Sequence, residues 1–124
     1  MVKVEIEYII NCSPAILYQL ISTPSGLSEW FAEDVNIKND IYTFIWDGSE
    51  EQAKLINKKK DHSIKFHWLE HEDEETYLEL TIHIDELTKD VALLITDFCD
   101  EGEENETKEL WITQLDDLSH RIGG

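Results

Sequence analysis

The sequence is poor in basic residues: ten Lys and Arg stand against 28 Asp and Glu, which leaves a formal net charge of −18. A surface of this sign repels the phosphates of nucleic acids and of anionic lipids, so neither kind of partner is predicted. There are only two cysteines, Cys12 and Cys99, far apart and without a CxxC spacing. With no signal peptide in view, this usage indicates reduced thiols and a cytoplasmic protein.

Further absences concern membranes and chemistry. No apolar run approaches the ~20 residues that a membrane-spanning helix needs. The five histidines show no HxH, HExxH or Cys/His spacing, and there is no phosphate loop or nucleophile elbow. We therefore predict no metal, no cofactor and no catalytic residue. His71 lies in the acidic run EHEDEE (70–75), where it either helps to attract a cation or belongs to a solvated loop.

Aromatic and other apolar residues are present in the amount that a folded domain needs. The chain has 124 residues, is 41% hydrophobic, and contains four each of Trp, Tyr and Phe. This length and composition predict one globular domain over residues 1–124, with a core that forms without disulfides. The acidic runs 70–75 and 100–106 keep the surface soluble or meet a basic protein partner.

The periodicity of apolar residues divides the chain into helices and strands. Alternation with period two predicts strands, and spacing of three and four residues predicts helices. The predicted strands lie within 2–10, 34–39, 40–48, 50–61, 62–70, 76–87 and 90–98, and the predicted helices within 14–22, 24–31 and 103–122. Gly123 and Gly124 end the last helix.

Both short helices begin with the same signals. Ser13 and Thr23 are suited to cap them, and Pro14 and Pro24 to occupy the first helical position. Gly26, inside the second helix, is expected to weaken it by about 1 kcal/mol relative to alanine. That helix ends in Trp30 and Phe31 (TPSGLSEWF), which carry more apolar surface than a short, turn-rich segment needs for itself.

The order of these elements predicts an α+β fold. Consecutive strands with tight turns indicate an antiparallel meander, and one polar face per strand indicates a sheet with one side open to water. The long C-terminal helix then covers the other side. Strand 90–98 is apolar on both faces, so either a loop or a second copy of the chain is expected to cover its outer surface.

Four segments resemble the START-like helix-grip superfamily: SPAILYQLIS with TPSGLSEWF, YTFIWDG, IKFHW and LWITQLDDL. They are similar, more narrowly, to domains homologous to activators of the Hsp90 ATPase. STPSGLSEWFAEDV, FIWDGSEE and TDFCDEGEE also resemble small stand-alone START-like proteins of bacteria. The resemblance implies a helix-grip fold, in which a curved antiparallel sheet of about seven strands wraps a long C-terminal helix, with two short helices after the first strand. It also implies a ligand cavity between sheet and helix.

The residues expected to line that cavity are mostly aromatic, with few polar anchors. They are Trp30, Phe31, Phe44, Trp46, Phe66, Trp68, Asp97, Trp111, Gln114 and Leu115. The alternative is that the aromatic residues simply fill the core. Asp97 (or Thr96, depending on the register of its strand) and Gln114 either orient a hydroxyl or carbonyl of the ligand, or are boundary side chains.

Three hypotheses for the function follow. The first is binding of a small apolar ligand, a lipid or an aromatic metabolite, in the cavity. The alternative is a regulatory, co-chaperone-like domain that meets a protein partner through its acidic surface. An enzyme of cyclase or hydrolase type is the third, and only the range of the superfamily motivates it.

Overall fold

A computed structural model describes residues 1–73 and 75–122, so the predicted helix end at Gly123 and Gly124 lies outside the described residues. The elements within these residues are β1 (Val2–Ile9), α1 (Pro14–Ser22), α2 (Pro24–Trp30), β2 (Asp34–Lys38), β3 (Ile41–Trp46), β4 (Ser49–Lys59), β5 (Ser63–Trp68), β6 (Leu78–Ile84), β7 (Val91–Cys99) and α3 (Glu104–Arg121). The predicted order and type of the elements are confirmed.

All neighbouring strands are antiparallel, in the order β1-β7-β6-β5-β4-β3-β2. Strands β2 to β7 form a meander in sequence order. Strand β1 pairs with β7 and is the edge strand at that side of the sheet. Asn39 and Asp61 have positive φ angles of 57° and 58°, a conformation that Asn and Asp tolerate in tight turns. Both lie where one predicted strand ends and the next begins.

The two short helices begin as predicted. The hydroxyl oxygens of Ser13 and Thr23 accept hydrogen bonds from backbone N–H groups at distances of 3.2 and 3.0 Å, which satisfies donors that a helix start leaves unpaired. The Trp30 indole N–H donates to the carbonyl of Leu20 over 2.8 Å. This bond joins α2 to α1.

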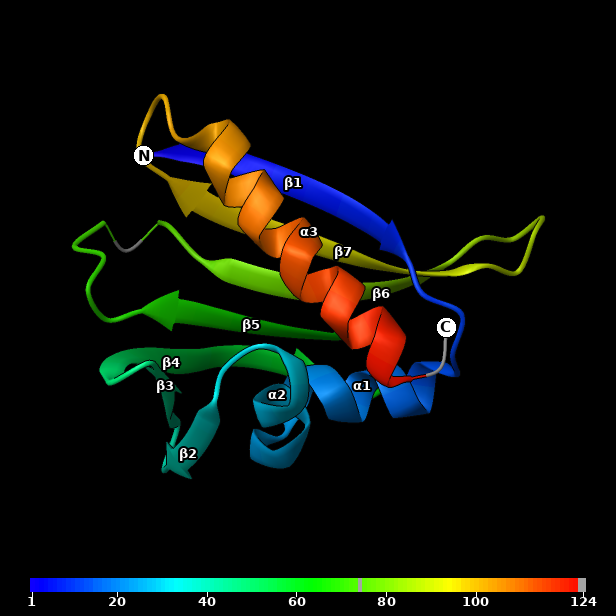
Figure 1. Cartoon of the computed structure of the whole chain (residues 1–124), viewed down its shortest axis with the longest axis horizontal. Helices are drawn as coiled ribbons and strands as arrows, with labels where there is room; N and C mark the ends of the chain where they lie inside the picture. Colours follow the sequence, from blue (N-terminus) through cyan, green and yellow to red (C-terminus); the bar gives the residue numbers. More distant parts are fainter. Residues whose placement is uncertain (74, 123–124) are drawn as a thin grey trace.

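Helix α3 crosses the concave face of the sheet, while α1 and α2 lie at one end of it (Figure 1). The buried residues of α3, Trp111, Leu115 and Leu118, point toward the sheet. The hydroxyl of Tyr8 on β1 donates to the Asp116 carboxylate on the helix. The core therefore lies between one helix and the concave face, as the α+β helix-grip prediction requires.

The opposite, convex face carries the polar residues of each strand. On β7 this face presents Leu94 and Phe98, which are half-buried, and Ala92, which is buried. The ring of Phe98 packs edge-on against Tyr77 at 5.2 Å between ring centres. The side chain of Tyr77, just before β6, thus covers part of this strand's outer surface.

Two findings bear on compartment and membrane. Cys12 and Cys99 are free thiols, and Cys99 is buried. In the part of the chain that the structure describes, no helix combines the length and the apolar character that crossing a bilayer requires.

Candidate functional site

Aromatic side chains meet in one group under the N-terminal half of α3. We call this group, formed by Trp30, Phe31, Phe44, Trp46, Phe66, Trp68 and Trp111, the aromatic cluster. The Phe31 ring stacks on Trp111 at 5.3 Å and meets Phe44 and Trp46 edge-on at 5.2 and 5.3 Å. These are favourable aromatic separations. The rings fill the space between them by packing on one another.

The cluster has a buried centre and a partly exposed edge. Phe44 and Phe66 are 0% and 1% exposed, and Leu115 of α3 beside them is 0% exposed. Trp46 and Trp68, by contrast, are half-buried, with 6.4 Å between their ring centres. The edge formed by these two indoles is where a molecule from solvent meets the cluster first.

A polar pocket of about 200 Å³ adjoins this edge, and we call it the inner pocket. It is lined by Glu51, Trp68, Glu70, His71, Asp97 and Phe98. Asp97 pairs with Val4, which is 2% exposed, so both side chains are on the concave face. This register decides between the two residues that the sequence left open, because it turns Asp97 inward and Thr96 outward.

Asp97 is held by two donors. Its Oδ1 accepts from the Phe98 N–H over 2.8 Å, and its Oδ2 accepts from the Trp111 indole N–H over 3.0 Å. Burial raises the pKa of Asp97, while these two hydrogen bonds and the nearby His71 act in the opposite direction. Burial disfavours the charged form of a carboxyl group, and hydrogen bonds to the carboxylate favour it.

Glu51 is the site residue that sequence reasoning missed. It pairs with Phe44, which is 0% exposed, and therefore shares the concave face with Ala53. Burial raises its pKa most, the charge of Glu70 adds to this, and His71 counteracts it. The signal was present in the alternation of EEQAKL, where Glu51 has the same parity as Ala53 and Leu55.

His71 is also part of the site. Its Nδ1 lies 3.3 Å from the hydroxyl oxygen of Thr76, and its ring lines the inner pocket. His71 lies in the loop after β5 and is partly buried there, and its attraction of a cation stays a prediction. Within residues 1–73 and 75–122, however, no group of three or more His, Cys, Asp or Glu side chains is arranged to hold a metal ion.

The raised pKa of Glu51 predicts a pH-dependent effect of Glu51→Gln. A carboxyl whose pKa is higher in the folded state stabilises the fold below its unfolded pKa, and this contribution is lost as the pH rises through the folded pKa. Glutamine does not titrate. We therefore expect the variant to gain stability over the wild type as the pH rises from about 4 to about 8, measured by urea unfolding.

Glu50→Gln is the matched control, because it removes the same charge from the exposed preceding residue on β4. We expect its stability difference from the wild type to vary less with pH. Equal pH dependence in the two variants would contradict the burial of Glu51 in the inner pocket.

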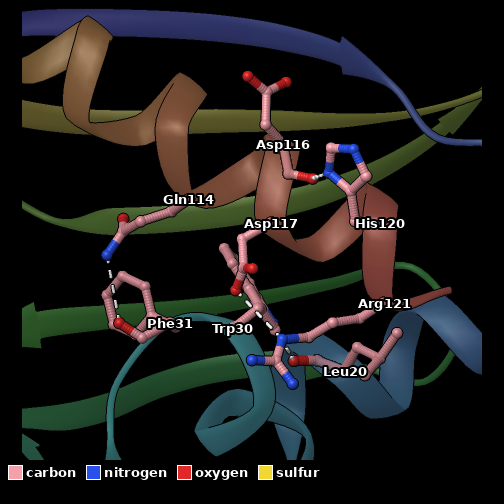
Figure 2. Close-up of polar contacts among 8 residues, drawn as sticks. All are labelled: Leu20, Trp30, Phe31, Gln114, Asp116, Asp117, His120 and Arg121. Atoms are coloured by element: carbon pink, nitrogen blue, oxygen red, sulfur yellow. Dashed lines mark hydrogen bonds and ion pairs between the residues drawn. The ribbon is translucent and has the colours of Figure 1, made fainter.

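A groove between α2 and α3 adjoins the cluster on the side of Trp30, Phe31 and Trp46. The carbonyl oxygen of Phe31 accepts from the Trp46 indole N–H at 2.6 Å and from the Gln114 amide at 3.2 Å. Figure 2 shows Gln114 directed at this carbonyl and, closer to the end of α3, Arg121 paired with Asp117 over 3.1 Å. The groove encloses about 320 Å³ and is open to solvent.

The predicted site residues thus fall into three places. Trp68 and Asp97 line the inner pocket, and Trp30, Phe31, Trp46 and Gln114 line the groove. Phe44, Phe66, Trp111 and Leu115 are buried between them. Gln114 and Asp97 therefore line different hollows, the groove and the inner pocket.

A curved antiparallel sheet that wraps a long C-terminal helix, with a polar pocket at the edge of its aromatic interior, defines a helix-grip protein. The chain belongs to the START-like superfamily, since the model of the START-like superfamily domain matches residues 1–124. The resemblance inferred from the sequence is confirmed. No curated protein matches the chain.

Several solved structures are similar. BfR322 from Bacteroides fragilis, determined by NMR, is 38% identical with a TM-score of 0.67, over 99% of this chain and 91% of that one. The Aha1 dimer from Colwellia psychrerythraea is 17% identical with a TM-score of 0.79, over 96% and 94%. CalU16 from Micromonospora echinospora is 14% identical with a TM-score of 0.72, over 95% and 74%. The last two likenesses concern the fold alone.

Proposed function

We propose that the protein binds a small aromatic molecule at the inner pocket, with the ring against Trp68 and the polar head on Asp97 and Glu51. One observation carries this proposal: two carboxyl groups with pKa values raised by burial lie on the concave, aromatic-lined face of the sheet. Perturbed titratable groups of this kind gather at functional sites. A few polar groups beside apolar walls are typical of small-molecule pockets.

The size of the pocket favours an aromatic metabolite over a lipid. The inner pocket encloses about 200 Å³, whereas pockets for drug-sized ligands enclose about 300–1,000 Å³. The centre of the aromatic cluster is already filled by its own side chains, of which Phe44 and Phe66 are at most 1% exposed. A ligand with one ring fits beside Trp68 without displacing them, while an acyl chain does not.

The free acceptors of the pocket select the head group. Each oxygen of Asp97 already accepts one hydrogen bond from the protein and retains a second lone pair. Ionised carboxylates accept hydrogen bonds but do not donate them. A head that donates, such as an amine or an alcohol, therefore suits the pocket, and a carboxylate head is repelled.

Three probes that share one ring test this proposal: benzylamine, benzyl alcohol and benzoate. In amide NMR spectra of the nitrogen-labelled protein, we expect the first two to shift the signals of Trp68 and Phe98, and benzoate to leave them in place. Asp97→Asn removes the charge on the head-group site, so benzylamine is expected to bind roughly ten-fold more weakly. Asp100→Asn, in the exposed turn after β7, is the control and should bind as the wild type does.

Two results would overturn the proposal. One is an affinity of the inner pocket for benzoate that equals its affinity for benzylamine. The other is an absence of any shift at Trp68 and Phe98 combined with acyl chains bound after incubation with a lipid extract, observed by native mass spectrometry. The latter result would favour the lipid alternative. We place the binding activity in the cytoplasm, where free thiols such as Cys12 and Cys99 are the rule.

Regulation of a protein partner is the second candidate function, and the surface of α3 favours it. Leu110 and Ile112 are 68% and 43% exposed on the helix, among the acidic residues Glu106 and Glu109. Exposed apolar side chains framed by charges are typical of contact surfaces. A basic protein or a second copy of the chain is the partner that this candidate proposes, and a lack of response to all three probes would favour it.

A further inference from the structure

The convex face of the sheet carries a second hollow, on the side away from α3. It encloses about 580 Å³ and is lined by Lys54, Ile56, Lys65, His67, Glu75, Thr76 and Tyr77. Lys54 and His67 are directly opposite one another on β4 and β5, so their side chains share this face. We propose that this outer hollow binds an organic anion, a carboxylate or phosphate ester with an apolar body.

The distribution of charge supports an anionic ligand. Lys54, Lys58, Lys59, Lys60 and Lys65 are five of the ten basic residues of the chain, and all lie on the β4–β5 hairpin. Between residues 54 and 67 the only acidic residue is Asp61. In a protein of net charge −18, this hairpin is the place where an anion meets excess positive charge.

The two lysines of the hollow are not neutralised by ion pairs in the described part of the chain, where the ion pairs are Lys3–Glu5 and Arg121–Asp117. The ammonium of Lys65 lies instead over the ring of Tyr77, 4.2 Å from its centre. This contact holds the cation in place without using its charge on a carboxylate. Glu75 is the carboxylate at the rim of the hollow, and it is exposed.

His67 adds an oriented ring. Its Nδ1 lies 2.9 Å from the carbonyl oxygen of Thr76. A carbonyl only accepts, so Nδ1 carries the proton and donates it, which leaves Nε2 as the nitrogen that meets a ligand. Thr76 is 3% exposed, so the partner that orients the ring is itself buried.

The hollow also has an apolar wall. Tyr77 is supported from behind by Phe98, at 5.2 Å between ring centres. The pairing of β4 with β5 shifts between Leu55 and Asn57, and Ile56, at this bulge, is 51% exposed. Bulges of this kind redirect side chains and are frequent beside binding sites. An apolar body against Ile56 and Tyr77, with its oxyanion near the lysines, satisfies both parts of the hollow.

The probes are phenyl phosphate and benzoate. Inorganic phosphate represents the anionic head group without an apolar body, and benzyl alcohol represents the apolar body without an anionic head group. At about 0.15 M salt the Debye length is about 8 Å, so the local lysines dominate over the distant acids. We expect both organic anions to shift the amide signals of Lys65, His67 and Tyr77, and to bind more tightly than either part alone. Lys54→Gln with Lys65→Gln should weaken binding about ten-fold or more.

Lys58→Gln with Lys60→Gln is the matched control, because it removes the same charge from the same hairpin outside the hollow, and its affinity should stay within about two-fold of the wild type. Equal losses of affinity in the two double variants would show that the anion responds to the overall charge of the hairpin and not to this hollow, which would overturn the proposal. So would inorganic phosphate that binds as tightly as phenyl phosphate. Signals at Glu51 and Glu70, which line the inner pocket and not the outer hollow, report the inner pocket separately, so failure at one site is not mistaken for failure at the other.

Discussion

Replacing Phe31 with alanine is expected to lower the free energy of unfolding by about 3–5 kcal/mol. Phe31 is 6% exposed, and its ring contacts those of Trp30, Phe44, Trp46 and Trp111. These neighbours come from α2, β3 and α3, so no single shift closes the space that the ring leaves. Because small domains are stable by only about 5–15 kcal/mol, this is a large share of the total.

Urea unfolding followed by tryptophan fluorescence and circular dichroism measures this loss. Phe98→Ala is the control: its ring is half-buried on the convex face and packs edge-on against Tyr77, and we expect a loss of about 1 kcal/mol. A loss below about 1 kcal/mol for Phe31→Ala would contradict the packed interior. It would indicate a loosely filled cavity between sheet and helix, as a lipid-binding protein requires.

The second large effect is expected for Gly26→Ala. A Cβ atom at this position would lie 2.1 Å from the carbonyl oxygen of Gln19 and 2.7 Å from the Cα of Leu20, both in the backbone of α1. Backbone atoms of a helix do not move aside as a flexible side chain does, so α2 must shift away from α1. We expect a loss of roughly 3 kcal/mol, the upper end of what overpacking usually costs.

Thermal unfolding should show this as a decrease in Tm of roughly 10 °C, with weaker burial of Trp30, whose indole bonds to Leu20. Gly48→Ala separates steric overlap from backbone strain. Gly48 has a φ of +83°, and a Cβ atom at this position would meet no atom within 4 Å. That substitution strains the backbone alone and is expected to cost about 1–2 kcal/mol. A Gly26→Ala variant as stable as the wild type would mean that the two helices do not pack as closely as described.

Gly26 shows how a local rule is reversed by tertiary contact. Helix propensity predicts that alanine stabilises this position by about 1 kcal/mol. The contact with α1 makes the same substitution destabilising, because the close approach of the two helices leaves no room for a methyl group. We therefore expect the opposite sign to that of helix propensity, and no feature of TPSGLSEWF alone reveals the neighbour that reverses it.

The aromatic pair at the end of this segment has a clear role in the structure. Trp30 anchors α2 to α1 through its indole N–H. Phe31 joins α2 to β3 and α3 at the centre of the aromatic cluster. The helical spacing placed both side chains on the buried side correctly. Whether they seal a core or line a pocket, however, depended on residues far away in the sequence, as in the Gln114–Phe31 hydrogen bond, which spans 83 positions.

The sites were accessible to sequence reasoning to different degrees. The inward direction of Asp97 was one of two alternatives, and the pairing of β7 with β1 resolved it. Glu51 could have been found from its parity on β4. That it shares a pocket with Asp97, three strands further along the sheet, follows only from the strand order and the curvature that brings them together.

The sequence by itself determined the order and type of the elements, the caps at Ser13 and Thr23, and the alternation of inward and outward residues on strands other than β7. These depend on periodicity and on hydrogen bonds between residues a few positions apart. Only the tertiary structure decided that the aromatic cluster is packed, that Asp97 and Glu51 meet, and that Lys54 and Lys65 face one hollow. Contacts of this kind depend on strand register and helix approach, which are properties of the whole sheet and leave no local pattern in the chain.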